Sequence, residues 1–194
     1  GDDGGVLPSL DPNLADIKVG DYVYDGLIAL IAKHDMPVFQ SADELPDSML
    51  LSFSIWAALR SDTYREAVTM REDGTIFIPA AVVEKSMADH FYVTRQVVHQ
   101  SVSVYTDFTY SEEEGGYTVW ATGVDTKYLP RVAAISHEGE TYQIKLDYVD
   151  IERLGDAELT PETPSAKSVA VVLSGSGKDY RLLSLALLSA PEGG

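Results

Sequence analysis

The segment from Asp47 to Leu59 is the strongest constraint on the fold, because its apolar side chains point in nearly every direction when the segment is placed on a helix. A helix that is apolar all round is stable only when other elements bury it. We therefore predict that this segment is the central helix of the fold. The apolar residues that define it are Met49, Leu50, Leu51, Phe53, Ile55, Trp56 and Leu59.

Two further helices are predicted on either side of this central segment. Asp21 can cap a helix that ends before Pro37, since proline disfavours helical geometry in the residue before it. The spacing Ser41-x-x-Glu44 is typical of a capping box at a helix start. Pro79 is placed to open another helix, which runs through Phe91.

Strand patterns dominate after residue 107, with one short strand before it at 75–78. A strand is predicted at 117–122, and two hairpins at 131–149 and 168–190, where apolar and polar residues alternate. Residues 63–71 and 93–105 fit either a helix or a strand. Helices first and antiparallel strands later predict an α+β fold, with N-terminal helices packed on a curved antiparallel sheet built from the C-terminal half.

The chain reads as one α+β domain over residues 20–190, with a leader at 1–19 and a tail at 191–194. The leader is rich in Gly, Asp and Pro, which is typical of a flexible spacer. We expect it to follow a lipid anchor upstream of Gly1; an arbitrary boundary explains it equally well. No apolar run approaches the roughly 20 residues that span a bilayer. These features favour an extracellular or cell-surface location, with the cytoplasm as the alternative.

The charge balance bears on the possible partners. The 194 residues contain 14 Lys and Arg against 31 Asp and Glu, a formal charge of −17. Nucleic acids and anionic membranes are polyanions, so association with either is electrostatically opposed. The chain has no cysteine, which excludes disulfides, thiol nucleophiles and Cys-ligated metal centres. The partner is expected to be an unidentified protein or small molecule.

One glycine-rich stretch resembles a phosphate loop, but its spacing is wrong. The stretch from Gly175 to Lys178 lacks the first glycine of the G-x-x-x-x-G-K-[ST] pattern, because Val172 stands at that position, and Asp179 follows the lysine. A strand precedes and follows it, so no helix N-terminus could face a phosphate. We predict an ordinary hairpin turn.

The four histidines do not form a metal-binding or catalytic pattern. None is four residues from another, as a zinc motif on a helix requires. His34 is expected at a helix end, where a charged imidazole would interact favourably with the helix dipole. His90 is expected to be a hydrogen-bonded packing residue, and His137 to lie in a turn. His99 has no assigned role.

The acidic clusters and serines also give no catalytic prediction. The clusters Asp2-Asp3, Glu112 to Glu114 and Asp147/Asp150/Glu152 lack the glycine and ligand spacing of a calcium loop, and are expected on solvated surfaces. No G-x-S-x-G elbow is present. We therefore assign no catalytic, cofactor-binding or metal-ligating residue.

The aromatic residues are candidates for a binding surface. Eleven tyrosines could line a binding groove. Trp56 is expected in the core, and Trp120 could face either way.

The order of the elements is similar to that of a known group. A strand and helix at 73–91, a glycine-flanked tyrosine strand at 114–120, and hairpins at 140–148 and 178–183 follow an apolar helix. This order resembles that of uncharacterised secreted proteins and lipoproteins of Gram-positive gut bacteria. The resemblance implies a cystatin-like or NTF2-like sheet and export to the cell surface. It implies no activity and no functional residue.

Three functions are compatible with these patterns. The first is a non-catalytic extracellular domain that binds a ligand or a protein through the concave face of its sheet. The second is a small hydrolase or isomerase with an acid–base pair in a cone-shaped pocket. The third is a structural or assembly module.

Overall fold

The computed structural model describes residues 23–121, 125–176 and 179–189, and has a mixed α+β architecture. Its helical elements are η1 (Tyr24–Ile28, a π-helix), α1 (Ala29–His34), the 3₁₀ turns η2 (Ala42–Glu44) and η3 (Asp62–Ala67), α2 (Asp47–Leu59), α3 (Ala80–His90) and α4 (Ile151–Leu154). Its strands are β1 (Thr69–Met70), β2 (Thr75–Pro79), β3 (Val102–Ser103), β4 (Asp107–Ser111), β5 (Gly116–Trp120), β6 (Tyr128–Glu138), β7 (Thr141–Asp150), β8 (Lys167–Ser176) and β9 (Asp179–Ser189).

The strands form two antiparallel sheets rather than the one sheet that the sequence indicated. One sheet has the order β1-β2-β5-β4-β3, and the other has the order β6-β7-β8-β9. The second sheet is built from the C-terminal half, as predicted. The first was missed because its strands are short, and β2 is separated from its partner β5 by the whole of α3.

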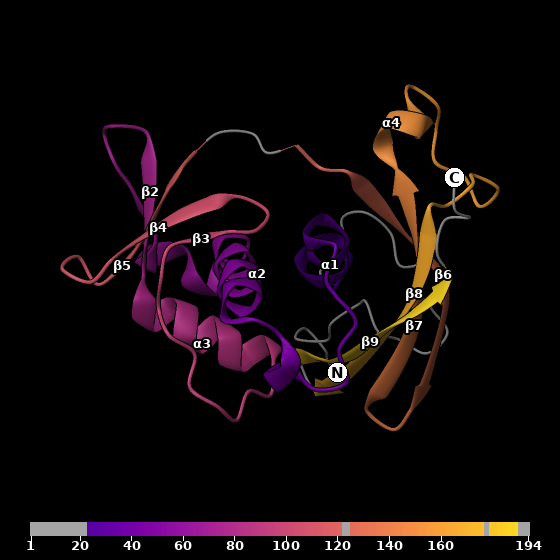
Figure 1. The fold of residues 1–194 in the computed structure, drawn as a ribbon, viewed down its shortest axis with the longest axis horizontal. Coiled ribbons are helices and arrows are strands. Elements are labelled where there is room, and N and C mark those ends of the chain that lie inside the picture. The colour runs from indigo at the N-terminus through magenta and orange to yellow at the C-terminus, as the bar shows by residue number, and fades with distance from the viewer. Residues whose placement is uncertain (1–22, 122–124, 177–178, 190–194) are drawn as a thin grey trace, which may run out of the picture.

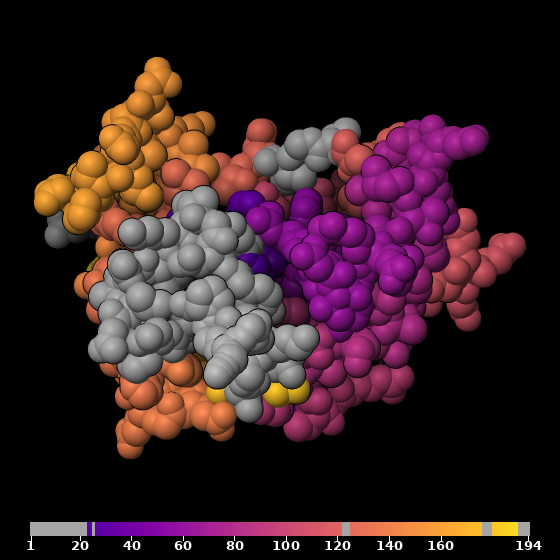
Figure 2. Space-filling view, turned by 180° about the vertical axis from the view of Figure 1, so that it is seen from behind, coloured from indigo at the N-terminus to yellow at the C-terminus, as the bar shows by residue number. Residues whose placement is uncertain are grey.

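The helices α1, α2 and α3 lie between the two sheets (Figure 1). α2 and α3 pack on each other beside the five-stranded sheet, and α1 lies between α2 and the four-stranded sheet. Seen from behind, the purple and magenta segments around α2 and the orange segments of the four-stranded sheet occupy opposite sides of the molecule (Figure 2). One continuous cluster of buried residues nevertheless includes side chains from α1, α2, α3 and both sheets.

The central helix is found where the all-round apolar pattern predicted it. α2 starts after Pro46, and nine of its residues are buried, including the two serines Ser52 and Ser54. The capping-box spacing before it forms a 3₁₀ turn instead of a helix start. There the Ser41 hydroxyl accepts a hydrogen bond from the N–H of Asp43, and Glu44 accepts one from the N–H of Gln40.

The other helix boundaries also follow the proline signals. α1 ends at His34, and Asp35 adopts the left-handed conformation (φ 45°) that terminates it before Pro37. α3 follows Pro79, as predicted. The helix predicted from Asp21 is described only from Val23 onward.

The two regions that fitted either a helix or a strand have mixed structures. Residues 62–67 form η3, and β1 follows it. Of residues 93–105, only Val102 and Ser103 belong to a strand. Both predicted hairpins are present as β6–β7 and β8–β9, and the second continues to the pair Ser176 and Asp179. Residues 177–178 and Ala190 lie outside the described residues.

The helical half is joined to the edge of the four-stranded sheet through two phenylalanines. Phe39 exchanges backbone hydrogen bonds of 3.0 and 2.9 Å with Leu185 of β9. Phe91, at the end of α3, forms a parallel bridge with Leu182 of the same strand. This second bridge fixes the position of the chain that leaves α3, and with it one wall of the site described next.

Candidate functional site

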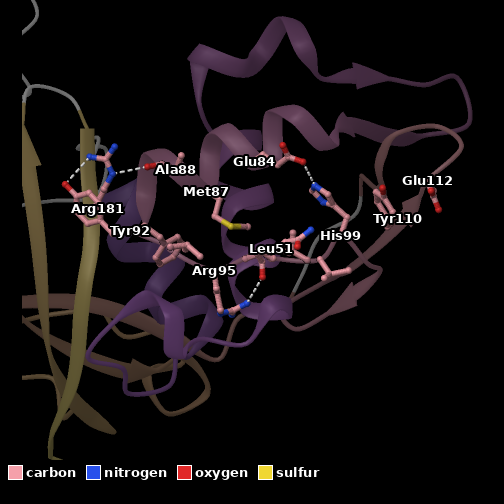
Figure 3. A pocket seen from close by; sticks show the side chains of 15 residues that line it. Leu51, Glu84, Met87, Ala88, Tyr92, Arg95, His99, Tyr110, Glu112 and Arg181 are labelled. Atoms are coloured by element: carbon pink, nitrogen blue, oxygen red, sulfur yellow. Dashed lines mark hydrogen bonds and ion pairs between the residues drawn. The ribbon is translucent and has the colours of Figure 1, made fainter.

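A groove of about 840 Å³ lies between α3 and the chain that follows it. This volume is within the range of about 300–1,000 Å³ that is typical of ligand pockets. Met87 and Ala88 of α3 form one wall, and residues 92–93 and 95–99 form the other. Arg181 and Tyr92 lie at one end and Tyr110 and Glu112 at the other (Figure 3). Sequence reasoning did not find this groove, since its walls meet only through tertiary packing.

Residues 92–101, here called the wall segment, form an extended chain outside both sheets. Their exposure alternates: Val93, Arg95, Val97 and His99 are half-buried, and the residues between them are exposed. This period of two is the pattern of a strand. Within the described part of the chain, however, the wall segment makes no backbone–backbone hydrogen bond. It therefore has the shape of a strand without a strand partner.

Two carboxylates hold the wall segment from the side of α2. Asp43 accepts a hydrogen bond of 2.7 Å from the N–H of Thr94 and another from its hydroxyl. Asp47 accepts one of 3.1 Å from the N–H of Val98. The hydrogen bonds from Thr94 hold the pKa of the Asp43 carboxyl below its ordinary value. The N–H of Val98 and then Arg95 do the same for the pKa of Asp47.

Arg95 anchors the middle of the wall segment. Its guanidinium donates to the carbonyl oxygens of Asp43 (3.0 Å) and Leu45 (2.5 Å) and forms an ion pair with Asp47. It also donates to the Gln96 carbonyl oxygen at 3.2 Å. With this many partners the guanidinium has a structural role. It fixes the wall and has little capacity left for a ligand.

His99 is held on both ring nitrogens. Nδ1 lies 2.7 Å from the Tyr117 hydroxyl, and Nε2 lies 2.7 Å from Glu84 of α3. The ring stacks on Tyr110 with 5.4 Å between centroids. Tyr117 is fully buried, and burial raises its pKa to about 12. The Glu84–His99–Tyr117 chain thus links α3, the wall segment and β5, and closes this end of the groove.

Arg181 of β9 forms the opposite end. Its Nε donates to the Ala88 carbonyl oxygen at 2.9 Å, and the guanidinium lies over the Tyr92 ring, 4.7 Å from the centroid. Nη1 reaches the Tyr92 hydroxyl at a long 3.4 Å. Among the described residues no carboxylate pairs with it. In contrast to Arg95, Arg181 lines the groove with one nitrogen, Nη2, that has no hydrogen-bond partner among the described residues.

The structure corrects the expectation for His34. The residue is at the end of α1, as predicted, but it is buried (5% exposed), which disfavours the charged form that would interact with the helix dipole. Its Nδ1 contacts the Leu30 carbonyl oxygen and its Nε2 contacts the Ser52 hydroxyl, both at 2.9 Å. Burial lowers its pKa to about 4. The imidazole is therefore neutral at pH 7.

The other two histidines are placed by packing. His90 contacts the Ser86 carbonyl oxygen at 2.7 Å and lies edge-on to Phe53, which confirms its role as a hydrogen-bonded packing residue. His137 was expected in a turn, but it lies within β6, paired with Tyr142 and stacked on its ring. The strand extends this far because that stack adds a cross-strand pair.

The acidic clusters divide between surface and interior. Glu112 to Glu114 are exposed in the β4–β5 turn, as predicted, and Asp150 caps α4. Asp147 is the exception, because it is buried (8% exposed) between Arg131 and the Ser168 hydroxyl. The ion pair with Arg131 compensates its burial, and no sequence spacing indicated it. Asp2 and Asp3 lie outside the described residues.

The two tryptophans differ in exposure. Trp56, expected in the core, is partly buried and packs against the core through Tyr105 and Phe108. Trp120 is 62% exposed at the end of β5.

No group of three or more His, Asp or Glu side chains in the described ranges is arranged to hold a metal ion. No helix in the same ranges is long and apolar enough to cross a membrane.

Comparisons of the chain with family models, with curated proteins and with solved structures found no match.

Proposed function

We propose that the protein is a non-catalytic binding domain whose ligand occupies the groove between α3 and the wall segment. The observation that carries this proposal is the groove itself, an open space of about 840 Å³ with apolar side chains along it and charged or aromatic side chains at both ends. Concave sites of this kind, with few and fixed polar groups, are typical of ligand binding.

The groove is a better site than the concave face of the sheet that sequence reasoning favoured. The inner face of the four-stranded sheet carries Ile144, Leu146, Val171 and Leu173, all of which are buried in the continuous core. A ligand could reach that face only by displacing this packing. The groove requires no such rearrangement.

The arrangement of the polar groups favours binding over catalysis. General acid–base chemistry needs a group that is free to exchange a proton with a substrate. Both nitrogens of His99 are already engaged by Glu84 and Tyr117, and its side chain is only 18% exposed. An acid–base pair built on His99 would therefore have to use residues that hold the wall in place.

Two finer parts of the proposal concern fold type and location. The helices packed beside antiparallel strands support a cystatin-like or NTF2-like type, which a solved structure with the same strand order would establish. The acidic, cysteine-free composition supports a place at the cell surface. Protease treatment of intact cells tests this, since a surface protein is degraded while a cytoplasmic marker survives.

The site is tested by filling the groove. Ala88→Trp places an indole on the exposed groove face of α3, and Ala81→Trp places the same group on an exposed position of α3 outside the groove. A thermal-shift panel of peptides, sugars, cell-wall fragments, nucleotides and lipids is run on both variants and on the wild type. A ligand at about a hundred times its dissociation constant stabilises its protein by about 2.7 kcal/mol. We expect a shift of a few degrees in the wild type and Ala81→Trp, and none in Ala88→Trp. An equal shift in all three proteins would place the ligand elsewhere.

A further inference from the structure

The groove has a wall that can offer backbone hydrogen bonds as well as side chains. On the basis of the proposed function, we infer that its ligand is an extended peptide segment that lies along the wall segment and presents a carboxylate to Arg181. The carboxylate is that of an acidic side chain of the peptide. Three observations carry this inference.

The first is the unused hydrogen-bonding capacity of the wall segment. On the α2 side, the N–H groups of Thr94 and Val98 are bound by Asp43 and Asp47. The backbone N–H and C=O groups of Val93 and Val97, each one position before an anchored residue, have no hydrogen-bond partner in the described part of the chain. Exposed extended backbone with free donors and acceptors is the surface on which a peptide adds as a further strand.

The second is the rigidity of this wall. Extended chain outside a sheet loses conformational entropy when a ligand orders it, and that loss weakens binding. Here Arg95 and the two aspartates hold the wall segment from one side, and His99 holds its far end between Glu84 and Tyr117. The segment is therefore ordered before the ligand arrives, and its free groups are already in position.

The third is the charge at the ends of the groove. The chain has a net charge of −17, yet one end of the groove presents Arg181 with donors that no described carboxylate occupies. The guanidinium is oriented by the Ala88 carbonyl oxygen and by the Tyr92 ring. A planar guanidinium fixed in this way matches the geometry of a carboxylate. Glu84 and Glu112 lie toward the other end, where they would repel a second acidic group.

Three libraries of random octapeptides on beads provide the test. They are identical except that one fixed position is Glu, Gln or Lys, and the N-termini are acetylated. The labelled full chain is applied to each library. We expect the Glu library to be labelled roughly tenfold more than the Gln library, because a charge-assisted hydrogen bond contributes this much. The Lys library should be labelled least.

The Arg181→Gln variant is expected to lose the preference for Glu, whereas Arg65→Gln, at an exposed ion pair away from the groove, should keep it. Melting curves of both variants serve as the check that they are folded. Arg181→Lys, which keeps the charge without the planar fork, should keep part of the preference. N-methylation of alternate residues in a selected peptide should abolish binding in one register and spare it in the other.

The results separate the two proposals. Equal labelling of the Glu, Gln and Lys libraries, or no effect of N-methylation in either register, overturns the peptide inference. If the wild type binds only a non-peptide ligand of the thermal-shift panel, and Ala88→Trp does not, the groove remains the site and the peptide inference fails. If peptides bind the wild type and Ala88→Trp equally, the groove itself fails.

Discussion

At the scale of single residues, the buried imidazole of His34 ties stability to pH. The ring lies against Phe53 and Tyr105, with centroids 5.6 and 5.2 Å away, and both of its nitrogens are hydrogen-bonded. The nearby charge of Lys33 adds to the effect of burial. Protonation in the folded state would place a cation in this apolar site. The folded protein therefore binds a proton at His34 less readily than the unfolded chain does.

This difference predicts a loss of stability in weak acid. The pKa of His34 is about 4 in the folded protein against an ordinary 6.5, so the unfolded state gains a proton first as the pH falls. The stability that His34 contributes is complete above pH 6.5 and decreases by about 3 kcal/mol on approach to pH 4. We expect the free energy of unfolding of His34→Gln, measured in urea, to depend less on pH over this range. If the free energy of unfolding depends on pH in the same way for the wild type and the variant, this account is wrong.

At the scale of elements, the wall segment shows how side chains can hold a strand-like chain where no sheet does. In the sequence, the spacing of Val93, Val97 and Val98 fits a helix, whereas Val102 and Val104 alternate as in a strand, so the sequence leaves the structure of residues 93–105 open. The groups that decide the matter, Asp43 and Asp47, lie 51 positions earlier in the chain than the residues they bind. No pattern among neighbouring residues in the sequence indicates contacts between residues so far apart. The helices α2 and α3, by contrast, were predictable because burial pattern and proline position are local signals.

The role of Asp47 is tested by Asp47→Asn, with Asp62→Asn as the control at an exposed ion pair. We expect the first to destabilise the protein by about 1 kcal/mol at pH 7, since it weakens a charge-assisted bond to Val98 and a partly exposed ion pair with Arg95. The control should change stability little. The pKa of Asp47 is lowered in the folded protein, so its contribution is complete above the ordinary value of 3.8 and is lost as the pH falls below it. The difference in the free energy of unfolding between Asp47→Asn and the wild type should therefore decrease near pH 2–3. If this difference is the same at pH 7 and pH 3, the charge of Asp47 is not its cause.

At the scale of the whole molecule, two sheets and the helices between them share one core, and the groove depends on this assembly. One end of the groove comes from β9 through Arg181 and the other from β4 through Tyr110, while α3 and the wall segment form its sides. The sequence predicted the C-terminal hairpins because apolar and polar residues alternate along their strands. It predicted the buried helix because apolar side chains lie all round it. Both patterns indicate which side chains are buried. It could not predict which strands form a separate sheet or that Arg181 would reach Ala88, since both depend on packing between residues far apart in the chain.

Amide hydrogen exchange, followed residue by residue by NMR at neutral pH, tests most directly whether the groove has an open backbone wall. We predict that the N–H groups of Val93 and Val97 exchange quickly, because they have no described partner, and that those of Thr94 and Val98 are protected by Asp43 and Asp47. Addition of a selected peptide should then slow the exchange of Val93 and Val97. Uniform, strong protection across residues 92–98 in the free protein would mean that this backbone is already paired, and would contradict the account.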